Sequence, residues 1–283
     1  AAVLSLALSA AASANVVRYV DDDAPPGGDG ATWETAYRYL QDALAQSPDK
    51  VRIAQGTYRA DQTAANGGGD YNRAKSFELY DGLSLRGGYA GLGAEHPDER
   101  DPALFHTILD GDLYGNDDDE IVNDNTHMIL DAGNASNVTI NGIRVINAHG
   151  LGVSGAGLHM YDSDVEIVDS HFEDNHAHLG GAIHATSSTL QITGTTFRSN
   201  QAEGMGGAIR LEGCECVVII DCDLYDNYCK RIGGGIYCKN HDGPIIFDDT
   251  EFVGNYAQVS SGGMFVNGDS IELRKCKFEN NWT

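Results

Sequence analysis

The chain has 283 residues, of which 42 are Asp or Glu and 18 are Lys or Arg, giving a formal net charge of −24. Such a surface repels phosphate backbones and anionic lipids, which argues against a nucleic acid or an anionic membrane as partner. Hydrophobic residues make up 41% of the chain, enough for a buried core, and the length allows one large all-β domain.

Residues 1–14 are typical of the remnant of a secretory signal peptide. An apolar run ends in Ala12, Ser13 and Ala14, which matches the A-x-A pattern of a cleavage site. No later stretch is apolar enough to span a bilayer. We therefore expect cleavage after Ala14 and a secreted or cell-surface protein with no direct membrane span in this sequence.

Residues 15–50 predict an N-terminal strand and one amphipathic helix. Apolar residues recur at helical spacing between Trp33 and Leu44. A helix laid across the end of a sheet covers strand edges that would otherwise recruit other strands. We therefore expect this helix to be a cap.

Residues 51–137 predict short strands joined by irregular loops. The expected strands are 51–53, 77–79, 83–85, 107–109 and 128–130. Two insertions, 61–75 and 110–125, are too polar and Gly-rich to pack and are expected to be loops.

Residues 138–283 contain a repeat. Its units have an apolar residue at the first, third and eighth positions and Asn at the eleventh: VEIVDSHFEDN (165–175), LQITGTTFRSN (190–200), VVIIDCDLYDN (217–227), IIFDDTEFVGN (245–255) and IELRKCKFENN (271–281). Successive Asn residues are 25, 27, 28 and 26 positions apart, and a GGAI-type block recurs at similar spacing. The alternation within each unit is that of a strand, and the period is too long for a heptad.

A parallel β-helix fits these units, because each repeat then makes one coil and like positions stack about 4.8 Å apart. The predicted inward apolar columns begin at Val165, Ile167, Phe172 and Ile183. The Asn column that begins at Asn175 would stack amides that donate and accept hydrogen bonds along the stack.

The GGAI and F-x-x-N units resemble those of right-handed parallel β-helix proteins of the pectin-lyase-like superfamily, and more closely the repeats of bacterial polymorphic outer-membrane proteins. Segments 19–60, 83–91 and 100–113 resemble the leader of large secreted β-helix proteins of planctomycetes and related bacteria. The resemblance implies an all-β fold: a single-stranded right-handed parallel β-helix, or solenoid, over residues 51–283 with an N-terminal capping α-helix. It does not imply one function, since the superfamily includes lyases, hydrolases and adhesins.

The sequence stops at residues 281–283, inside a repeat unit. We therefore expect that it is a piece of a longer protein, truncated at its C-terminus. An uncapped last coil also predicts that such a fragment associates end to end.

Outward side chains after the GGAI block form a candidate catalytic row. The row contains His159, His184, Arg210, Tyr237 and Phe265, which point outward if the flanking apolar residues point inward. Lyases and hydrolases of the superfamily act on the outer face of one sheet, so the resemblance implies that a polysaccharide could lie along this row. Arg210 would then be the base, with Tyr237 or His184 as the acid. The alternative is that these are polar surface residues with no catalytic role.

Other candidate groups are weaker. Asp174 and Asp226 share a column, but Ser199 separates them, which argues against a hydrolase pair. A histidine group around one coil predicts either a transition-metal site or a plain polar surface; its members are His171, His176, His178 and His184.

Candidate Ca²⁺ ligands lie in the acidic loops. The residues selected are Asp110, Asp112, Asp117 and Asp118, with residues 21–23 and 119–120 as further oxygen donors. None of these segments matches the D-x-[DN]-x-[DN]-G pattern, so a solvated acidic loop is the alternative.

Six cysteines allow several arrangements. Cys222 and Cys276 are two coils apart, about 10 Å, which exceeds the reach of a disulfide. Cys214 and Cys216, with His241 about one coil later, could be metal ligands. The alternative is that they form no metal site, because the C-x-x-C spacing of zinc sites is missing.

Together these observations favour a secreted or cell-surface module with a structural, adhesive or glycan-binding role and no catalysis. The alternative is a polysaccharide lyase or glycoside hydrolase that acts on the outer face of one parallel sheet. The expected partner is a polysaccharide or a cell-surface glycan.

Overall fold

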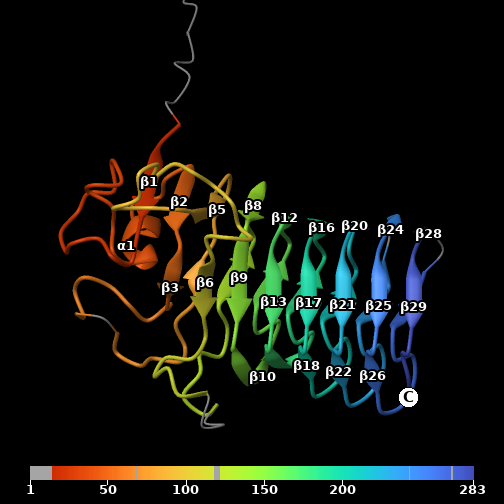
Figure 1. Cartoon of the computed structure of the whole chain (residues 1–283). Coiled ribbons are helices and arrows are strands. Elements are labelled where there is room, and N and C mark those ends of the chain that lie inside the picture. The colour runs from red at the N-terminus through yellow and green to blue at the C-terminus, as the bar shows by residue number, and fades with distance from the viewer. Residues whose placement is uncertain (1–14, 68, 118–121, 242, 269) are drawn as a thin grey trace, which may run out of the picture.

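The computed structural model describes residues 15–67, 69–117, 122–241, 243–268 and 270–283. The predicted signal-peptide remnant lies outside the described residues. In the described part, the chain winds into a parallel β-helix whose coils follow one another from the red N-terminal end to the blue C-terminal end (Figure 1). The predicted all-β solenoid is confirmed. No helix in this part has the length and apolarity needed to cross a membrane.

The described strands form four sheets, which we name A to D. Sheet A contains, in spatial order, β1 (Val17–Val20), β2 (Lys50–Ala54), β5 (Ser84–Tyr89), β8 (Val138–Asn141), β12 (Asp164–Val168), β16 (Thr189–Thr193), β20 (Cys216–Ile220), β24 (Ile245–Asp248) and β28 (Ile271–Arg274). Neighbouring strands pair in parallel, as expected when each coil contributes one strand to each sheet.

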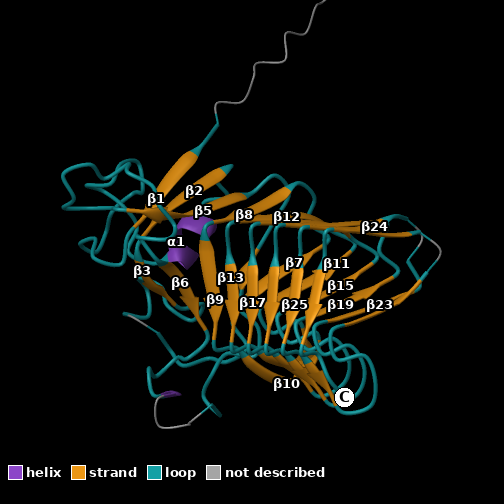
Figure 2. Cartoon of the chain, turned by 45° about the vertical axis from the view of Figure 1, so that its right-hand side comes forward, coloured by secondary structure: helices purple, strands orange, loops and turns teal. Residues whose placement is uncertain are grey.

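Sheets B and C form the other long faces of the solenoid (Figure 2). Sheet B contains β3 (Gly56–Tyr58), β6 (Thr107–Asp110), β9 (Ile143–Ile146), β13 (His171–Glu173), β17 (Thr196–Arg198), β21 (Asp223–Tyr225), β25 (Glu251–Val253) and β29 (Lys277–Glu279). Sheet C contains β4 (Phe77–Glu78), β7 (Leu130–Gly133), β11 (Leu158–Tyr161), β15 (Ile183–Thr186), β19 (Ile209–Glu212), β23 (Ile236–Lys239) and β27 (Met264–Asn267). β7 begins at Leu130, two residues later than the predicted start at Met128.

Sheet D is a narrower sheet between sheets B and C. It contains β10 (His149–Ser154), β14 (His176–Leu179), β18 (Gln201–Ala202), β22 (Tyr228–Cys229) and β26 (Tyr256–Ala257). Its inner side is narrow, because the side chains that it buries are small, among them Ala177, Ala202, Cys229 and Ala257.

The predicted capping helix over Trp33–Leu44 is shorter in the structure, because α1 covers only Leu40–Leu44. The preceding segment extends sheet A instead. Tyr37 forms a parallel bridge with Val20 of β1, and its backbone N–H donates to the carbonyl of Tyr19. The prediction of a long helix was wrong because pairing with an open strand edge outweighed the helical periodicity.

The inward columns follow the predicted register. Val165 pairs with Leu190 across β12 and β16, and Phe172 pairs with Phe197 across β13 and β17. The two phenylalanine rings stack with their centroids 5.3 Å apart. Complete burial of one such side chain contributes about 1.5–3 kcal/mol to stability. One continuous apolar core, from Val20 to Phe252, therefore holds the coils together.

A ladder of buried asparagines runs beside this core. The Nδ2 of Asn175 donates to the Oδ1 of Asn200 at 3.1 Å, and Asn200 donates to Asn227 in the same way at 3.0 Å. Asn255 and Asn281 continue the ladder, with distances of 2.9 Å for both steps. Each amide also bonds backbone groups, so the ladder satisfies polar atoms that the turns bury.

Candidate functional site

Sheet C carries the predicted catalytic residues on its outer face. The strands β15, β19 and β23 are in register, so that His184 pairs with Arg210, and Arg210 pairs with Tyr237. His159 and Phe265 extend the row at its two ends. The structure therefore brings the three predicted residues together on consecutive coils.

Arg210, in the middle of this row, contacts both a carboxylate outside the row and the next member of the row. Arg210 forms an ion pair with Glu212 on the same strand, and its guanidinium carbon lies 5.8 Å from the centroid of the Tyr237 ring. The exposed fractions of Arg210 and Tyr237 are only 8% and 7%. A substrate would find little of either side chain.

The electrostatics of the row do not favour acid and base catalysis. Burial, followed by the charges of Arg210 and His159, lowers the pKa of His184 to about 4. Both of its ring nitrogens are buried and have no hydrogen-bond partner among the described residues. His184 is therefore neutral near pH 7, and the one N–H that a neutral imidazole keeps is far too weakly acidic for it to act as a general acid. Arg210, paired with Glu212, has no free lone pair with which to act as a base.

The structure separates the predicted histidine group. His171 lies on β13 of sheet B, His176 and His178 lie on β14 of sheet D, and His184 lies on β15 of sheet C. Because these strands belong to different faces of the solenoid, the four side chains do not form one metal site. His176 instead contacts the carboxylate of Glu203, at 3.1 Å.

The outer face of sheet B holds a groove of about 500 Å³. It follows the solenoid axis, because β9, β13, β17, β21 and β25 all contribute to its lining. The lining residues are Arg144, His171, Phe172, Glu173, Thr196, Arg198, Tyr225, Asp226 and Val253. Most are polar and point outward between inward apolar positions, as strand alternation requires.

Charged groups and Tyr225 lie along this groove. Glu173 is flanked by two guanidinium groups, with an Arg144 Nη2 to Oε2 distance of 3.1 Å and an Arg198 Nη1 to Oε1 distance of 3.8 Å. The Arg198 side chain is 60% exposed, so its other nitrogens remain accessible. Burial, and then the neighbouring Asp223, raise the pKa of Tyr225 to about 12. Its hydroxyl therefore stays protonated and neutral at physiological pH.

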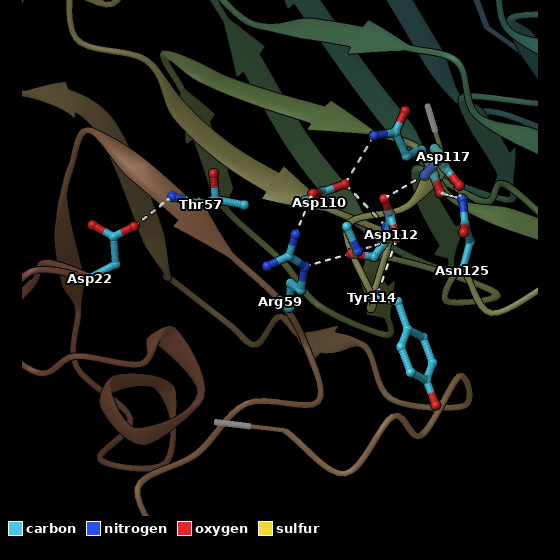
Figure 3. A network of polar contacts seen from close by, with 10 residues as sticks. Asp22, Thr57, Arg59, Asp110, Asp112, Tyr114, Asp117 and Asn125 are labelled. Atoms are coloured by element: carbon cyan, nitrogen blue, oxygen red, sulfur yellow. Dashed lines mark hydrogen bonds and ion pairs between the residues drawn. The ribbon is translucent and has the colours of Figure 1, made fainter. Parts of the chain in front are cut away.

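The predicted Ca²⁺ ligands lie at the end of β6 and in the acidic loop that follows it, and Asp118 lies outside the described residues. Asp110 already has partners: Arg59 binds its Oδ2 at 3.0 Å, and the Nδ2 of Asn147 donates to its Oδ1 at 3.0 Å (Figure 3). Because the guanidinium of Arg59 already neutralises this carboxylate, Asp110 is a poor candidate for a metal ligand.

Asp112 and Asp117 do lie together, and Asp124 joins them. One carboxylate oxygen of each residue lies within 4.8 Å of the others. Asp21, Asp22 and Asp23 form a similar group near β1.

The cysteines are free thiols. The Sγ of Cys222 donates to the Ile220 carbonyl at 3.1 Å, and burial raises the pKa of this thiol to about 12. Cys214 is also buried, with its Sγ 3.6 Å from the Ala185 carbonyl. In the described residues, the side chains close enough to share a metal ion are aspartates alone, so Cys214, Cys216 and His241 form no such group.

A family model described as the right-handed beta helix region matches residues 116–283, more than half of the chain. The chain belongs to the right-handed β-helix family. Among solved structures, this β-helix is similar to a rhamnogalacturonan lyase, with a TM-score of 0.51 and 13% identity over 93% of this chain and 62% of the lyase. It is also similar to the pectin methylesterase from Aspergillus niger, with a TM-score of 0.46 and 12% identity over 96% of this chain and 87% of the esterase.

At these identities the likeness to solved structures shows the fold alone, and the chain spans less than two thirds of the lyase. The sequence has no match among the curated proteins. The chemistry of this β-helix therefore has to be argued from its own side chains.

Sequence reasoning missed two features of this β-helix. The groove on sheet B was readable in part, because Glu173, Arg198 and Tyr225 each follow an inward residue of the Phe172 column and so must point outward. Asp124 lies seven positions after Asp117, and no spacing rule for an irregular loop brings the two carboxylates together.

Proposed function

We propose that this β-helix is a non-catalytic glycan-binding module that holds a linear polysaccharide along the outer face of sheet B. The observation that carries the proposal is the groove that crosses consecutive coils between Arg144 and Val253. Coils repeat about every 4.8 Å, close to the length of one pyranose residue, so successive sugars would meet equivalent positions of successive coils.

The side chains of the groove suit sugar hydroxyls. Arg144 and Arg198 donate hydrogen bonds, Glu173 accepts them, and the Tyr225 hydroxyl can do both. The Tyr225 ring also offers apolar surface at a position that is only partly exposed. Sites of this kind, with a few polar groups around an aromatic side chain, fix the orientation of a small or repetitive ligand.

The charge of the protein selects among glycans. The net charge of −24 repels polyuronates, and Glu173 partly neutralises the two guanidinium groups of the groove. A neutral or weakly charged polysaccharide is therefore the proposed ligand class. Secretion or display at the cell surface belongs to the same proposal and is supported by the signal-peptide pattern in residues 1–14.

The alternative, a lyase or hydrolase acting at His184, Arg210 and Tyr237, has weaker support. Arg210 and Tyr237 are largely buried, the Arg210 guanidinium is already paired with Glu212, and both ring nitrogens of His184 are buried without a partner among the described residues. The groove on sheet B has accessible polar groups and lies on a different face.

A binding panel tests the proposal. Calorimetric titration of the purified chain with neutral and acidic polysaccharides should show binding to at least one neutral glycan, with no release of reducing ends or unsaturated products. Arg198→Ala should weaken this binding about tenfold, because one charge-assisted hydrogen bond contributes about 1.5–3 kcal/mol before solvent screening.

Arg274→Ala is the matched control. Arg274 is 53% exposed, close to the 60% of Arg198, but it lies on sheet A. Equal losses in both variants would show that binding depends only on general charge. Binding that is lost in Tyr237→Phe but kept in Arg198→Ala would move the site to sheet C.

A further inference from the structure

The loop between β6 and β7 concentrates negative charge in a partly buried place. One carboxylate oxygen each of Asp112, Asp117 and Asp124 lies within 4.8 Å of the other two, and Asp112 is only 5% exposed. None of the three forms an ion pair among the described residues. Like charges at such separations repel strongly unless a cation lies between them.

Nearby arginines do not supply that cation. The guanidinium of Arg59 binds Asp110 and the backbone carbonyl of Asp112. The guanidinium of Arg73 donates to the backbone carbonyls of Asn125 and His149. Both basic side chains are therefore used on other groups.

Independent support comes from buried oxygens that lack a donor. Asn125 is 1% exposed; its Nδ2 donates to Asp117 at 2.8 Å, and its Oδ1 has no partner in the described structure. Figure 3 shows the amide nitrogen of Asn125 turned toward Asp117. The Oδ1 atoms of Asn116, Asp117 and Asp124 are likewise buried without a hydrogen bond to any described group. Such atoms cost about 1–3 kcal/mol each if they stay unsatisfied, and more when they are charged.

We propose that Asp112, Asp117 and Asp124, together with the amide oxygen of Asn125, bind one Ca²⁺ ion. The site uses oxygen donors alone, which Ca²⁺ prefers over zinc or copper. Ligands on opposite sides of Ca²⁺ lie at most about 5 Å apart, since each Ca–O distance is about 2.3–2.6 Å, and the carboxylates meet this limit.

The ion would fasten the loop to the following coil. The Nδ2 of Asn125 also donates to the Asn147 carbonyl at 2.7 Å, and Asn147 follows β9. The backbone N–H of Asp117 donates to Asp112 at 3.1 Å, which already curls the loop around the carboxylates. Ca²⁺ at this place therefore stabilises the N-terminal coils and lies apart from the groove on sheet B.

The test uses the full chain after treatment with a chelator. Titration with CaCl₂ should show binding of one ion per chain, and the Tm should rise by about 5 °C at a hundredfold excess over Kd. Mg²⁺ should bind at least tenfold more weakly, because its octahedral shell is smaller and keeps its waters. Terbium in place of Ca²⁺ should luminesce on excitation of tyrosine, since Tyr114 donates its N–H to Asp112.

Asp117→Asn and Asp124→Asn separate a metal site from a purely structural loop. Each should weaken Ca²⁺ binding at least tenfold, yet without Ca²⁺ each should be at least as stable as the wild type, because like charges are removed. Glu95→Gln removes one exposed charge elsewhere and should leave the Ca²⁺ response unchanged. The proposal fails if chelated protein gives neither heat nor a Tm shift with CaCl₂, or if Asp117→Asn and Asp124→Asn both respond to CaCl₂ as the wild type does.

Discussion

At the residue scale, backbone conformation explains some acidic side chains that the sequence offered as catalytic candidates. Asp174, Ser199 and Asp226 end successive strands of sheet B, with φ values of 53°, 53° and 52°. This left-handed region is adopted more readily by Asp, Asn and Gly than by bulkier residues. Their shared column therefore reflects the turn that each coil makes, rather than a pair of acids arranged for hydrolysis.

His184 is the residue whose environment gives the clearest pH prediction. Its pKa is about 4 in the folded chain and about 6.5 when unfolded, so the unfolded chain takes up the proton first as the pH falls. The stability that depends on neutral His184 is complete above pH 6.5 and is lost as the pH falls toward 4. The loss amounts to about 3 kcal/mol.

His184→Gln removes this titration. Urea unfolding at pH 7.5 and pH 4.5 should therefore show a smaller acid-induced loss of stability in the variant than in the wild type, while the other histidines contribute equally to both. Parallel pH profiles for the two proteins would show that His184 is not buried as described.

At the scale of elements, stacking made much of the fold predictable. The Phe172 and Asn175 columns could be assigned from the sequence because the coil length changes by only a few residues, so like positions stay in register. The helix over 33–44 could not, since its apolar spacing also suits a segment that bridges β1 through Tyr37 and buries Trp33 against Tyr89. Local periodicity does not reveal which strand edge lies open nearby.

The asparagine ladder gives a prediction at this scale. Asn200→Ala removes an amide that donates to the Phe172 carbonyl and to Asn227, and that accepts from Asn175. The buried partners are left unsatisfied, so the free energy of unfolding should fall by about 3 kcal/mol.

Equilibrium unfolding in urea measures this loss. Asn267→Ala is the control, because Asn267 is exposed on β27 and its replacement should change stability by less than about 0.5 kcal/mol. An Asn200→Ala loss as small as that of the control would mean that the ladder contributes little to cohesion between coils.

At the scale of the whole molecule, residues at like positions of successive repeats form rows on the outer surface of the solenoid. These rows differ in how much of their polar side chains a ligand can reach. The row on sheet C was predicted correctly as a row, but the sequence could not show that Arg210 and Tyr237 are buried, because the exposure of an outward side chain depends on how its neighbours pack around it. The groove on sheet B depends on the cross-section of the coil, which residue spacing does not encode.

The central claim is that this β-helix holds a glycan along its axis without cleaving it. The most direct measurement titrates the chain with oligosaccharides of increasing length from the polysaccharide it binds, and analyses the same samples for products. The affinity should rise with length until about five sugars, one for each coil at about 4.8 Å, and then level off with the oligosaccharides intact. Shortened products that disappear with His184→Gln or Arg210→Ala would contradict the claim and establish an enzyme on sheet C.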